Sequence, residues 1–456
     1  MVRVTDMTHG RPIRLILLFS LPLMLGSVFQ QLYTIVDTII IGRGVGMQAL
    51  ASIGAADWIN WLVLWGLQGF TQGFAILAAQ EFGAGAYDRL RRVLAMIVKL
   101  SCWFGIAVTI ISLLLVRPLL TLLHTDPAVF GGAQTYLYVQ FGGSLIIIAY
   151  NMAAAVLRCL GDSRTPLFAI IAASFANIAL DLLFVMGLGW GIFGASFATV
   201  LAQLIAFLLC LRSLRRLPFV QLTKADWKTD PAILLHLCRL GIPTGLQMSM
   251  ITLGGMVLQS VLNGFGVVFV AGYTAANKLY GILESASVAF GYAMTAYMGQ
   301  NRGARNAARI DAGIRAVLVL SAEFTAAIVT AMLLAGKPLL GLFLSTEEAG
   351  AADALAVAHR YLMVLMAFLF ALFVLQAYRS SLQGLGEMTV PTLSGFAEML
   401  MRMGAALVLP VFIGKSGVFF AEGAAWVCAA ALNLVWYYRI CASMKSLNAP
   451  YSYNIC

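Results

Sequence analysis

Charged residues are scarce in this sequence. Of its 456 residues, 61% are hydrophobic and only 11% are Asp, Glu, Lys or Arg. A chain of this composition cannot cover the surface of a soluble domain with polar groups. The composition therefore excludes an ordinary soluble protein and indicates one embedded in a membrane.

Residues and motifs typical of catalysis and metal binding are also few. The seven cysteines are scattered without a C-x-x-C pair, and the four histidines form no cluster at metal-ligand spacing. Neither a disulfide framework nor a zinc site is predicted. A membrane-embedded enzyme finds no support, because H-E-x-x-H and G-x-S-x-G motifs are missing. No organic cofactor is expected. Nucleic acid binding is not expected either, because the basic residues are distributed by loop.

Long apolar stretches separated by short polar breaks fill the chain instead. Each is about 20 residues or longer, enough to cross roughly 30 Å of hydrocarbon as a helix. The sequence predicts an all-α integral membrane protein with twelve transmembrane helices. The predicted spans are 14–41, 49–81, 93–116, 130–157, 165–188, 191–211, 239–263, 270–299, 312–335, 356–383, 391–413 and 417–440.

Lysine and arginine residues are distributed unevenly between alternate loops. Most fall before the first span, in every second loop and after the last span, and the stretch between spans 6 and 7 is the richest. Because basic loops stay in the cytoplasm, this asymmetry predicts a multi-pass plasma membrane protein with both termini cytoplasmic.

The second half of the sequence repeats the first at an offset of about 220 residues. Pro22 lies near the position equivalent to Pro243, Gln80 aligns with Gln300, and LGDSRTP at 160–166 matches LGEMTVP at 385–391. Six spans per half give both halves the same orientation, as in transporters whose halves flank a substrate cavity. We predict two pseudo-symmetric six-helix lobes: an N-terminal lobe at 1–211, a cytoplasmic linker at 212–238 and a C-terminal lobe at 239–456.

These patterns, over essentially the whole chain, resemble the multidrug and toxic compound extrusion (MATE) transporters. The resemblance implies an antiporter that expels organic, often cationic, compounds in exchange for H⁺ or Na⁺. The matching residues are Gln30, Gln31, Tyr33, Asp37, Gly42 and Arg43 in the first span, Gln80, Gly83, Ala84 and Gly85 with their echo Gly299, Gln300, Asn301, Gly303 and Ala304, and the two LGD/LGE-x-x-x-P stretches.

Asp37 stands inside an otherwise apolar span. A charged aspartate at bilayer depth costs at least about 2.5 kcal/mol, so it must face protein, water or a cation. Burial and a bound cation shift its protonation in opposite directions, and that competition could couple ion binding to transport. The alternative is a structural role as a cap or pairing group.

Span 5 carries a second acid. Asn177 and Asp181 are spaced i, i+4 and project from one helical face, where a carboxylate and an amide carbonyl could hold a hard cation. In the DinF-like branch of the family, an Asp in span 1, this Asn and Asp pair, and a Thr in span 6 form the cation site. The matching residues here are Asp37, Asn177, Asp181 and Thr199. For Asn177 and Thr199, plain helix–helix hydrogen bonds are the alternative.

The second half has not kept these acids. Val257, Arg402 and Ala406 stand opposite Asp37, Asn177 and Asp181. Glu398 and Arg402 are spaced i, i+4 and are predicted to form a buried structural ion pair. Another branch of the family uses acids in spans 7 and 10, and this chain has none there. We therefore predict coupling in the N-terminal lobe.

Glu284 in span 8 could face the substrate cavity, as could Gln30 and Tyr33, while Glu323 in span 9 could be balanced structurally. Pro22 and Pro243 are predicted to kink the first helix of each lobe, either in response to ion binding or as static kinks. The expected partners are a small-molecule substrate and membrane lipid, and the expected state is a monomer.

Two alternatives concern the transported compound. A flippase for a lipid-linked precursor would need several Lys or Arg facing its pyrophosphate, whereas Lys99 and Arg402 are the basic residues at membrane depth here. A dedicated metabolite exporter of the same superfamily stays open. A channel fits poorly, since two distinct lobes with lone acids suit alternating access.

Overall fold

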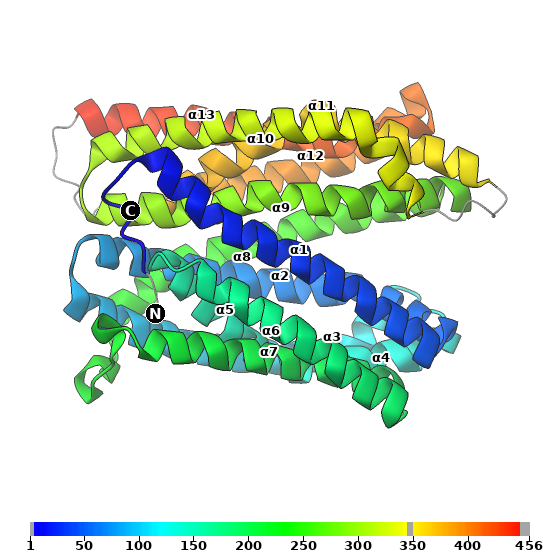
Figure 1. The fold of residues 1–456 in the computed structure, drawn as a ribbon, viewed down its shortest axis with the longest axis horizontal. Coiled ribbons are helices and arrows are strands. Elements are labelled where there is room, and N and C mark those ends of the chain that lie inside the picture. Colours follow the sequence, from blue (N-terminus) through cyan, green and yellow to red (C-terminus); the bar gives the residue numbers. More distant parts are fainter. Residues whose placement is uncertain (1–3, 344–349, 447–456) are drawn as a thin grey trace. The chain divides into compact units, whose positions relative to one another are not determined.

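The computed structural model describes residues 4–343 and 350–446 of the chain. Within these ranges the protein is built from helices, and no β-strand occurs (Figure 1). The α-helices are α1 (Pro12–Gly44), α2 (Met47–Gly83), α3 (Tyr87–Leu122), α4 (Pro127–Gly142), α5 (Ser144–Cys159), α6 (Arg164–Asp181), α7 (Gly191–Arg215), α8 (Pro231–Asn263), α9 (Val267–Gly303), α10 (Ala307–Gly341), α11 (Ala351–Gly384), α12 (Thr389–Ile413) and α13 (Phe420–Ser446).

Each predicted span corresponds to a helix or to a broken helix. Ten spans in the described part of the chain are long and apolar enough to cross a membrane. An eleventh is the pair α4 and α5, which bends by 50° at the break after Gly142. The twelfth is α9, which is as long as α2 but carries Lys278 and Glu284. The all-α, twelve-span membrane class is confirmed.

The stretch predicted as a linker, 212–238, contains helical structure of its own. Helix α7 continues to Arg215, two short 3₁₀ helices follow (η2, Pro218–Val220, and η3, Lys224–Trp227), and α8 begins at Pro231. Helix α8 therefore starts before the predicted residue 239, and the residues that it gains, PAILLHLC at 231–238, are mostly apolar. Lys99 Nζ of α3 donates to the Thr229 hydroxyl at 2.9 Å, which anchors the stretch to α3.

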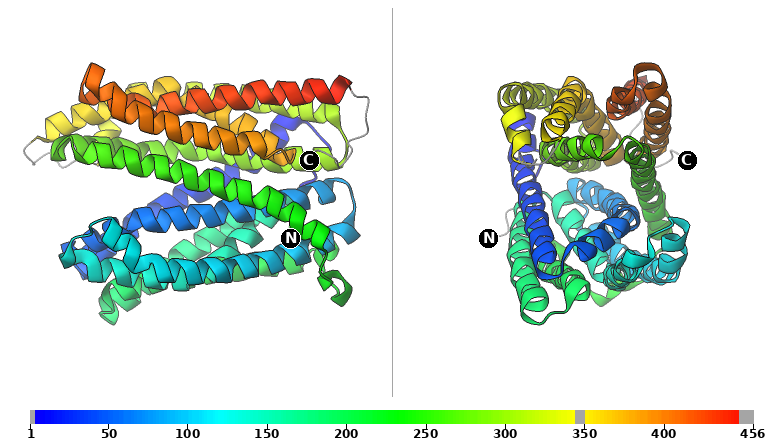
Figure 2. Two further views of the ribbon diagram at one scale, coloured as in Figure 1. Left: turned by 180° about the vertical axis from the view of Figure 1, so that it is seen from behind. Right: turned by 90° about the vertical axis from the view of Figure 1, so that its right-hand side faces the viewer.

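By internal contacts the chain divides into two compact units. Unit 1 comprises Met1–Asp6 and Leu21–Ser249, and unit 2 comprises Met7–Ser20 and Met250–Cys456. The boundaries after Ser20 and after Ser249 fall inside the long helices α1 and α8, so each of these helices contributes to both units. In unit 2, α12 and α13 lie side by side (Figure 2). The units differ from the lobes predicted at 1–211 and 239–456, because Met7–Ser20 belongs to unit 2 and the predicted linker, with α8 as far as Ser249, belongs to unit 1.

The repeat seen in the sequence also appears in the backbone. Left-handed glycines precede α2 and α9 at Gly46 and Gly266, and others follow α5 and α11 at Gly161 and Gly386. These pairs keep the sequence offsets of about 220 and 225 residues. Positive φ is cheap for glycine alone, so the same turn geometry has been kept at equivalent places in both halves.

A close backbone contact joins α2 to the first half of α8 within unit 1. A Cβ atom on Gly73 would lie 2.5 Å from the Leu240 carbonyl oxygen, and one on Gly69 would lie 2.7 Å from that of Thr244. Gly241 and Gly245 of α8 stand at the same i, i+4 spacing and are covered by the rings of two α2 phenylalanines. Small residues at this spacing let two membrane helices approach closely.

Pro22 and Pro243 both lie in helix interiors. Helix α1 is continuous from Pro12 to Gly44 and α8 from Pro231 to Asn263, so neither proline ends its helix. Each proline removes one backbone hydrogen bond, which weakens the helix locally. A role for these prolines in bending stays a prediction.

Candidate functional site

Asp37 and Asp181 meet in unit 1. Their carboxyl groups lie against one another, Asp37 from α1 and Asp181 from the last position of α6. Asp181 is fully buried and Asp37 is half-buried. Apart from this mutual contact, no partner among the described residues reaches Oδ1 of Asp37 or either oxygen of Asp181. Two carboxylates in contact repel one another unless a proton or another cation lies between them.

Asn177 lies one helical turn before Asp181 and is 1% exposed. Neither its amide oxygen nor its amide nitrogen has a hydrogen-bond partner in the described part of the chain. Leaving a buried polar group unsatisfied costs roughly 1–3 kcal/mol. The cost is avoided if the amide oxygen contacts a cation or a water held by the aspartates.

An apolar cluster fixes the helices that carry these residues. Ile40 and Ile41 of α1, Ala49 of α2, Val185 of the π-helix η1 (Leu182–Gly187) and Ala195 of α7 are buried together. Partly buried neighbours in the same cluster include Val36, Leu50, Ile53, Ile178 and Ile192. Val36 precedes Asp37 and Ile178 follows Asn177, so the packing of α1 against α6 sets the two acidic positions side by side.

Thr199 stands on α7, one turn beyond Ala195. Its hydroxyl donates to the Ala195 carbonyl at 3.2 Å, a bond within its own helix. The hydroxyl oxygen keeps a lone pair for a further contact. The packing of α7 against α6 places Thr199 on a helix that adjoins the acids.

Tyr33 and Gln30 belong to the surroundings of this site. Tyr33 lies within electrostatic reach of Asp37 and Asp181, and Gln30 and Thr34 hydrogen bond with the Tyr33 side chain. Gln30 is exposed and Tyr33 is half-buried. Their predicted role in a substrate cavity stays a prediction, and the structure adds that Tyr33 lies near the acid pair and that Gln30 contacts Tyr33.

One acid of this region was not singled out from the sequence. Asp57 of α2 lies near the Tyr136 hydroxyl of α4, and Asn60 Nδ2 donates to that hydroxyl at 3.2 Å. Tyr136 also lies within electrostatic reach of Asp37. The sequence could have indicated Asp57, because it is an acid inside the predicted span 49–81.

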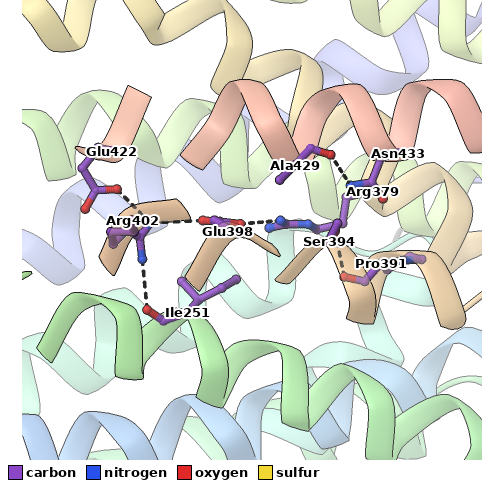
Figure 3. A network of polar contacts seen from close by, with 9 residues as sticks. All are labelled: Ile251, Arg379, Pro391, Ser394, Glu398, Arg402, Glu422, Ala429 and Asn433. Carbon is purple, nitrogen blue, oxygen red and sulfur yellow. Dashed lines mark hydrogen bonds and ion pairs between the residues drawn. The ribbon is translucent and has the colours of Figure 1, made fainter. Parts of the chain in front are cut away.

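Unit 2 holds a buried chain of ion pairs (Figure 3). Arg402 Nη2 lies 3.1 Å from Glu398 and 2.8 Å from Glu422, and Arg379 donates to the other oxygen of Glu398. Arg402 also donates to the Ile251 carbonyl at 3.0 Å. The predicted pairing of Glu398 with Arg402 is confirmed. Arg379 lies in predicted span 10 and is buried here, and Glu422 is an acid of span 12; the sequence analysis singled out neither residue.

Glu284 adjoins this chain of ion pairs. It is half-buried on α9, hydrogen bonds with Tyr280 one turn earlier, and lies within electrostatic reach of Glu422, Arg402 and Glu398. Glu323, on α10, is exposed. The substrate-cavity role predicted for Glu284 stays a prediction.

The residues of unit 1 fit a proton or a hard monovalent cation. Carboxylate and amide oxygens are the ligand types that hard cations prefer. No group of three or more His, Cys, Asp and Glu side chains suited to a metal ion occurs in residues 4–343 and 350–446. The donor types of Asp37, Asn177 and Asp181 suit a proton or Na⁺, and their role in ion binding stays a prediction.

Comparison with known proteins matches this chain to the family described as MatE, over residues 22–183 and 243–408. The two matched segments begin near Pro22 and at Pro243, in agreement with the internal repeat. "Probable multidrug resistance protein YpnP" of Bacillus subtilis (strain 168) is 31% identical over 451 residues, which is 96% of this chain and 97% of that protein.

A second relative, "Probable multidrug resistance protein YoeA" of the same organism, is 26% identical and covers 94% of each chain. Among solved structures, "Crystal structure of MATE in complex with MaL6" superposes with a TM-score of 0.90 at 23% identity, covering 98% of this chain and 100% of that one. That similarity establishes the fold.

Proposed function

Because the chain belongs to the MatE family, we propose that it is a secondary active antiporter that exports organic cations in exchange for H⁺ or Na⁺. The family consists of membrane transporters and not enzymes. Relatives named multidrug resistance proteins support a lipophilic drug-like substrate. The observation that carries the proposal is the contact between Asp37 and Asp181 beside the unsatisfied amide of Asn177.

The mechanism follows from competition for the buried acids. With the transporter open to the cytoplasm, substrate binds while Asp37 and Asp181 lack the coupling ion. After the transporter reorients, a proton or Na⁺ from outside enters between the two carboxyl groups and stabilises the substrate-free state. Coupling can be no larger than the difference in ion affinity between the two states. Thr199, Gln30 and Tyr33 would shape the path by which the ion reaches the pair.

The arginines of unit 2 favour a cationic substrate over a lipid-linked pyrophosphate. Arg379 donates to Glu398, and Arg402 divides its donors between Glu398, Glu422 and a backbone carbonyl. A pyrophosphate would need arginines whose charge is not already balanced. A precursor flippase therefore stays the weaker proposal.

The test is dye uptake into inside-out vesicles under an imposed proton gradient or sodium gradient. We expect gradient-driven uptake of a fluorescent cationic dye by the wild type, and its loss in Asp37→Asn and in Asp181→Asn at equal protein level. The gradient that drives uptake identifies the ion. The vesicles also assign the membrane orientation, since a cytoplasmic tag would be exposed to protease.

Asp88→Asn is the matched control. Asp88 lies in the first turn of α3, is 88% exposed in its side chain and pairs with Arg91, so transport should be unchanged. Wild-type activity in both aspartate variants would rule out the acid pair as the coupling site. If the wild type moves no cationic dye, the cation-export proposal fails and an anionic or lipid-linked substrate takes its place.

A further inference from the structure

The charges of the buried network in unit 2 do not balance. Three carboxyl groups, Glu284, Glu398 and Glu422, share two guanidinium groups, Arg379 and Arg402. With all five groups charged, one negative charge is left over. An uncompensated charge at bilayer depth is costly, so the network needs one more positive charge.

The contacts identify where that charge is missing. Glu398 accepts from both arginines, and Glu422 contacts Arg402 at 2.8 Å. Glu284 hydrogen bonds with Tyr280, whose ring stacks on that of Trp426 one turn after Glu422, so Glu284 lies near a second acid. The excess negative charge therefore lies at the Glu284 end of the network, beside Glu422.

The same end is the more accessible one. The side chain of Glu422 is 17% exposed and Glu284 is half-buried, whereas the side chains of Arg379, Glu398 and Arg402 are at most 6% exposed. The two acids that lack full compensation are thus less enclosed by protein than the arginine pairs. A group that must be neutralised and is not enclosed by protein can exchange its proton with water that enters beside it.

We propose that Glu284 and Glu422 form a second proton site in the protein, which takes up and releases one proton that the two acids share. Unit 2 then binds an ion of its own, although it lacks counterparts of Asp37 and Asp181. Any role of this proton in transport rests on the proposed function. Binding of the proton does not, because it can occur and be measured without transport.

The groups that face the site come from four helices. Helix α9 contributes the phenols of Tyr273 and Tyr280, and α11 contributes Arg379 and the phenol of Tyr361. Helix α12 contributes Glu398 and Arg402, and α8 contributes the Ile251 carbonyl. The two arginines pair with Glu398 and Glu422, so the proton is the charge that Glu284 lacks.

Proton uptake by the purified full-length protein tests the proposal. In lipid nanodiscs and weak buffer, a pH indicator records the protons bound when the pH is lowered from mildly alkaline to mildly acidic. Ordinary exposed carboxyl groups titrate near pH 4 and contribute little in this range, while the four histidines contribute equally in all variants. The background is Asp37→Asn with Asp181→Asn, which silences the acid pair of unit 1.

In that background we expect Glu284→Gln to lower the uptake by about one proton per chain. Glu422→Gln should cause the same loss, because it also removes the excess charge. Both substitutions together should lose about one proton and not two. Glu284→Asp, which preserves the acid, should retain the uptake. Retained uptake would show that substitution at this position leaves the site folded.

Asp353→Asn is the control, since Asp353 is an exposed acid in the first turn of α11 and should leave the uptake unchanged. Unchanged uptake in Glu284→Gln would overturn the proposal, because Glu284 would then hold its proton permanently or lack one. Loss of uptake on adding NaCl at constant pH would overturn the assignment of the ligand as a proton. Failure of the proposed function would instead appear as wild-type dye transport by the Asp37→Asn and Asp181→Asn variants.

Discussion

Individual buried acids are compensated in two different ways. Asp37 and Asp181 contact one another and leave oxygens without partners, whereas Glu398 accepts hydrogen bonds from two arginines. The first arrangement leaves room for an ion, and the second supplies its counter-charges permanently. At the position where unit 1 has Asn177, the repeat places Arg402 in unit 2. Val257 and Ala406 stand opposite Asp37 and Asp181, so unit 2 lacks the acid pair and has instead a guanidinium group that pairs with Glu398.

Removing the Glu398 carboxylate should lower stability more than most surface changes. Glu398→Leu leaves the buried charge of Arg379 without its acid and is expected to cost about 3–5 kcal/mol in unfolding free energy. Replacing both partners, by Glu398→Leu with Arg379→Leu, should recover much of that loss. Denaturant unfolding in mixed micelles measures both variants.

Equal destabilisation of the single and double variants would contradict this explanation, because the penalty would then come from packing and not from the unpaired charge. Asp353→Leu is a suitable surface reference, since Asp353 is exposed in the first turn of α11. Its effect should stay within about 0.5 kcal/mol.

Among the secondary-structure elements, α2 and α8 require small side chains where their backbones meet. Glycines at i, i+4 on both helices bring the two backbones into contact within unit 1. Such helices gain van der Waals contact that larger side chains would prevent. The packing of α2 also fixes Ala49 in the apolar cluster with Ile40 and Ile41, and it places Asp57 and Asn60 beside Tyr136.

Gly73→Ala should therefore destabilise the protein although alanine favours helices. Its Cβ would meet the Leu240 carbonyl oxygen at 2.5 Å and the Gly241 Cα at 2.6 Å, and backbone atoms cannot rotate away. We expect a cost of about 1–3 kcal/mol, as for other overpacked sites. Thermal unfolding of the detergent-solubilised protein checks it.

Gly54→Ala on the same helix is the matched control. A Cβ atom added at Gly54 would have no atom within 4 Å, so alanine should stabilise α2 by roughly 0.5–1 kcal/mol through its helix propensity. If both variants changed the melting temperature in the same direction, the close contact of α2 with α8 would not be the cause.

For the whole molecule, the proposed coupling of transport to an ion gradient depends on the acid pair. If Asp37 and Asp181 bind one ion jointly, the site is lost when either acid is replaced. The second replacement then has nothing further to remove. This separates a shared site from two independent ion sites, each of which would contribute its own share of the driving force.

We therefore expect the effects of Asp37→Asn and Asp181→Asn on gradient-driven transport to be non-additive. The double variant should transport about as slowly as each single variant, and the logarithms of the three rates provide the coupling energy in a double-mutant cycle. Gradient-independent dye exchange shows whether each variant still binds substrate. Additive effects would indicate that the two aspartates act separately.

The sequence by itself determined the membrane class, the twelve spans, the repeat and three members of the acid site. Apolar runs and internal repetition are local or one-dimensional properties, so they can be read without coordinates. Asp37, Asn177 and Asp181 were found because a polar residue inside an apolar span is conspicuous. Glu398 and Arg402 were paired correctly because i, i+4 neighbours on one helix must meet.

Only the tertiary structure decided which distant side chains touch. The contact of Asp37 with Asp181, the addition of Arg379 and Glu422 to the ion pairs, and the place of Asp57 beside Tyr136 all depend on the rotation of each helix about its axis. That rotation is set by packing among several helices, as in the cluster around Ile40 and Ala195, and a single helix does not encode it. The excess charge at Glu284 follows from the same cause, because charges can be counted against one another only after the helices that carry them are packed together.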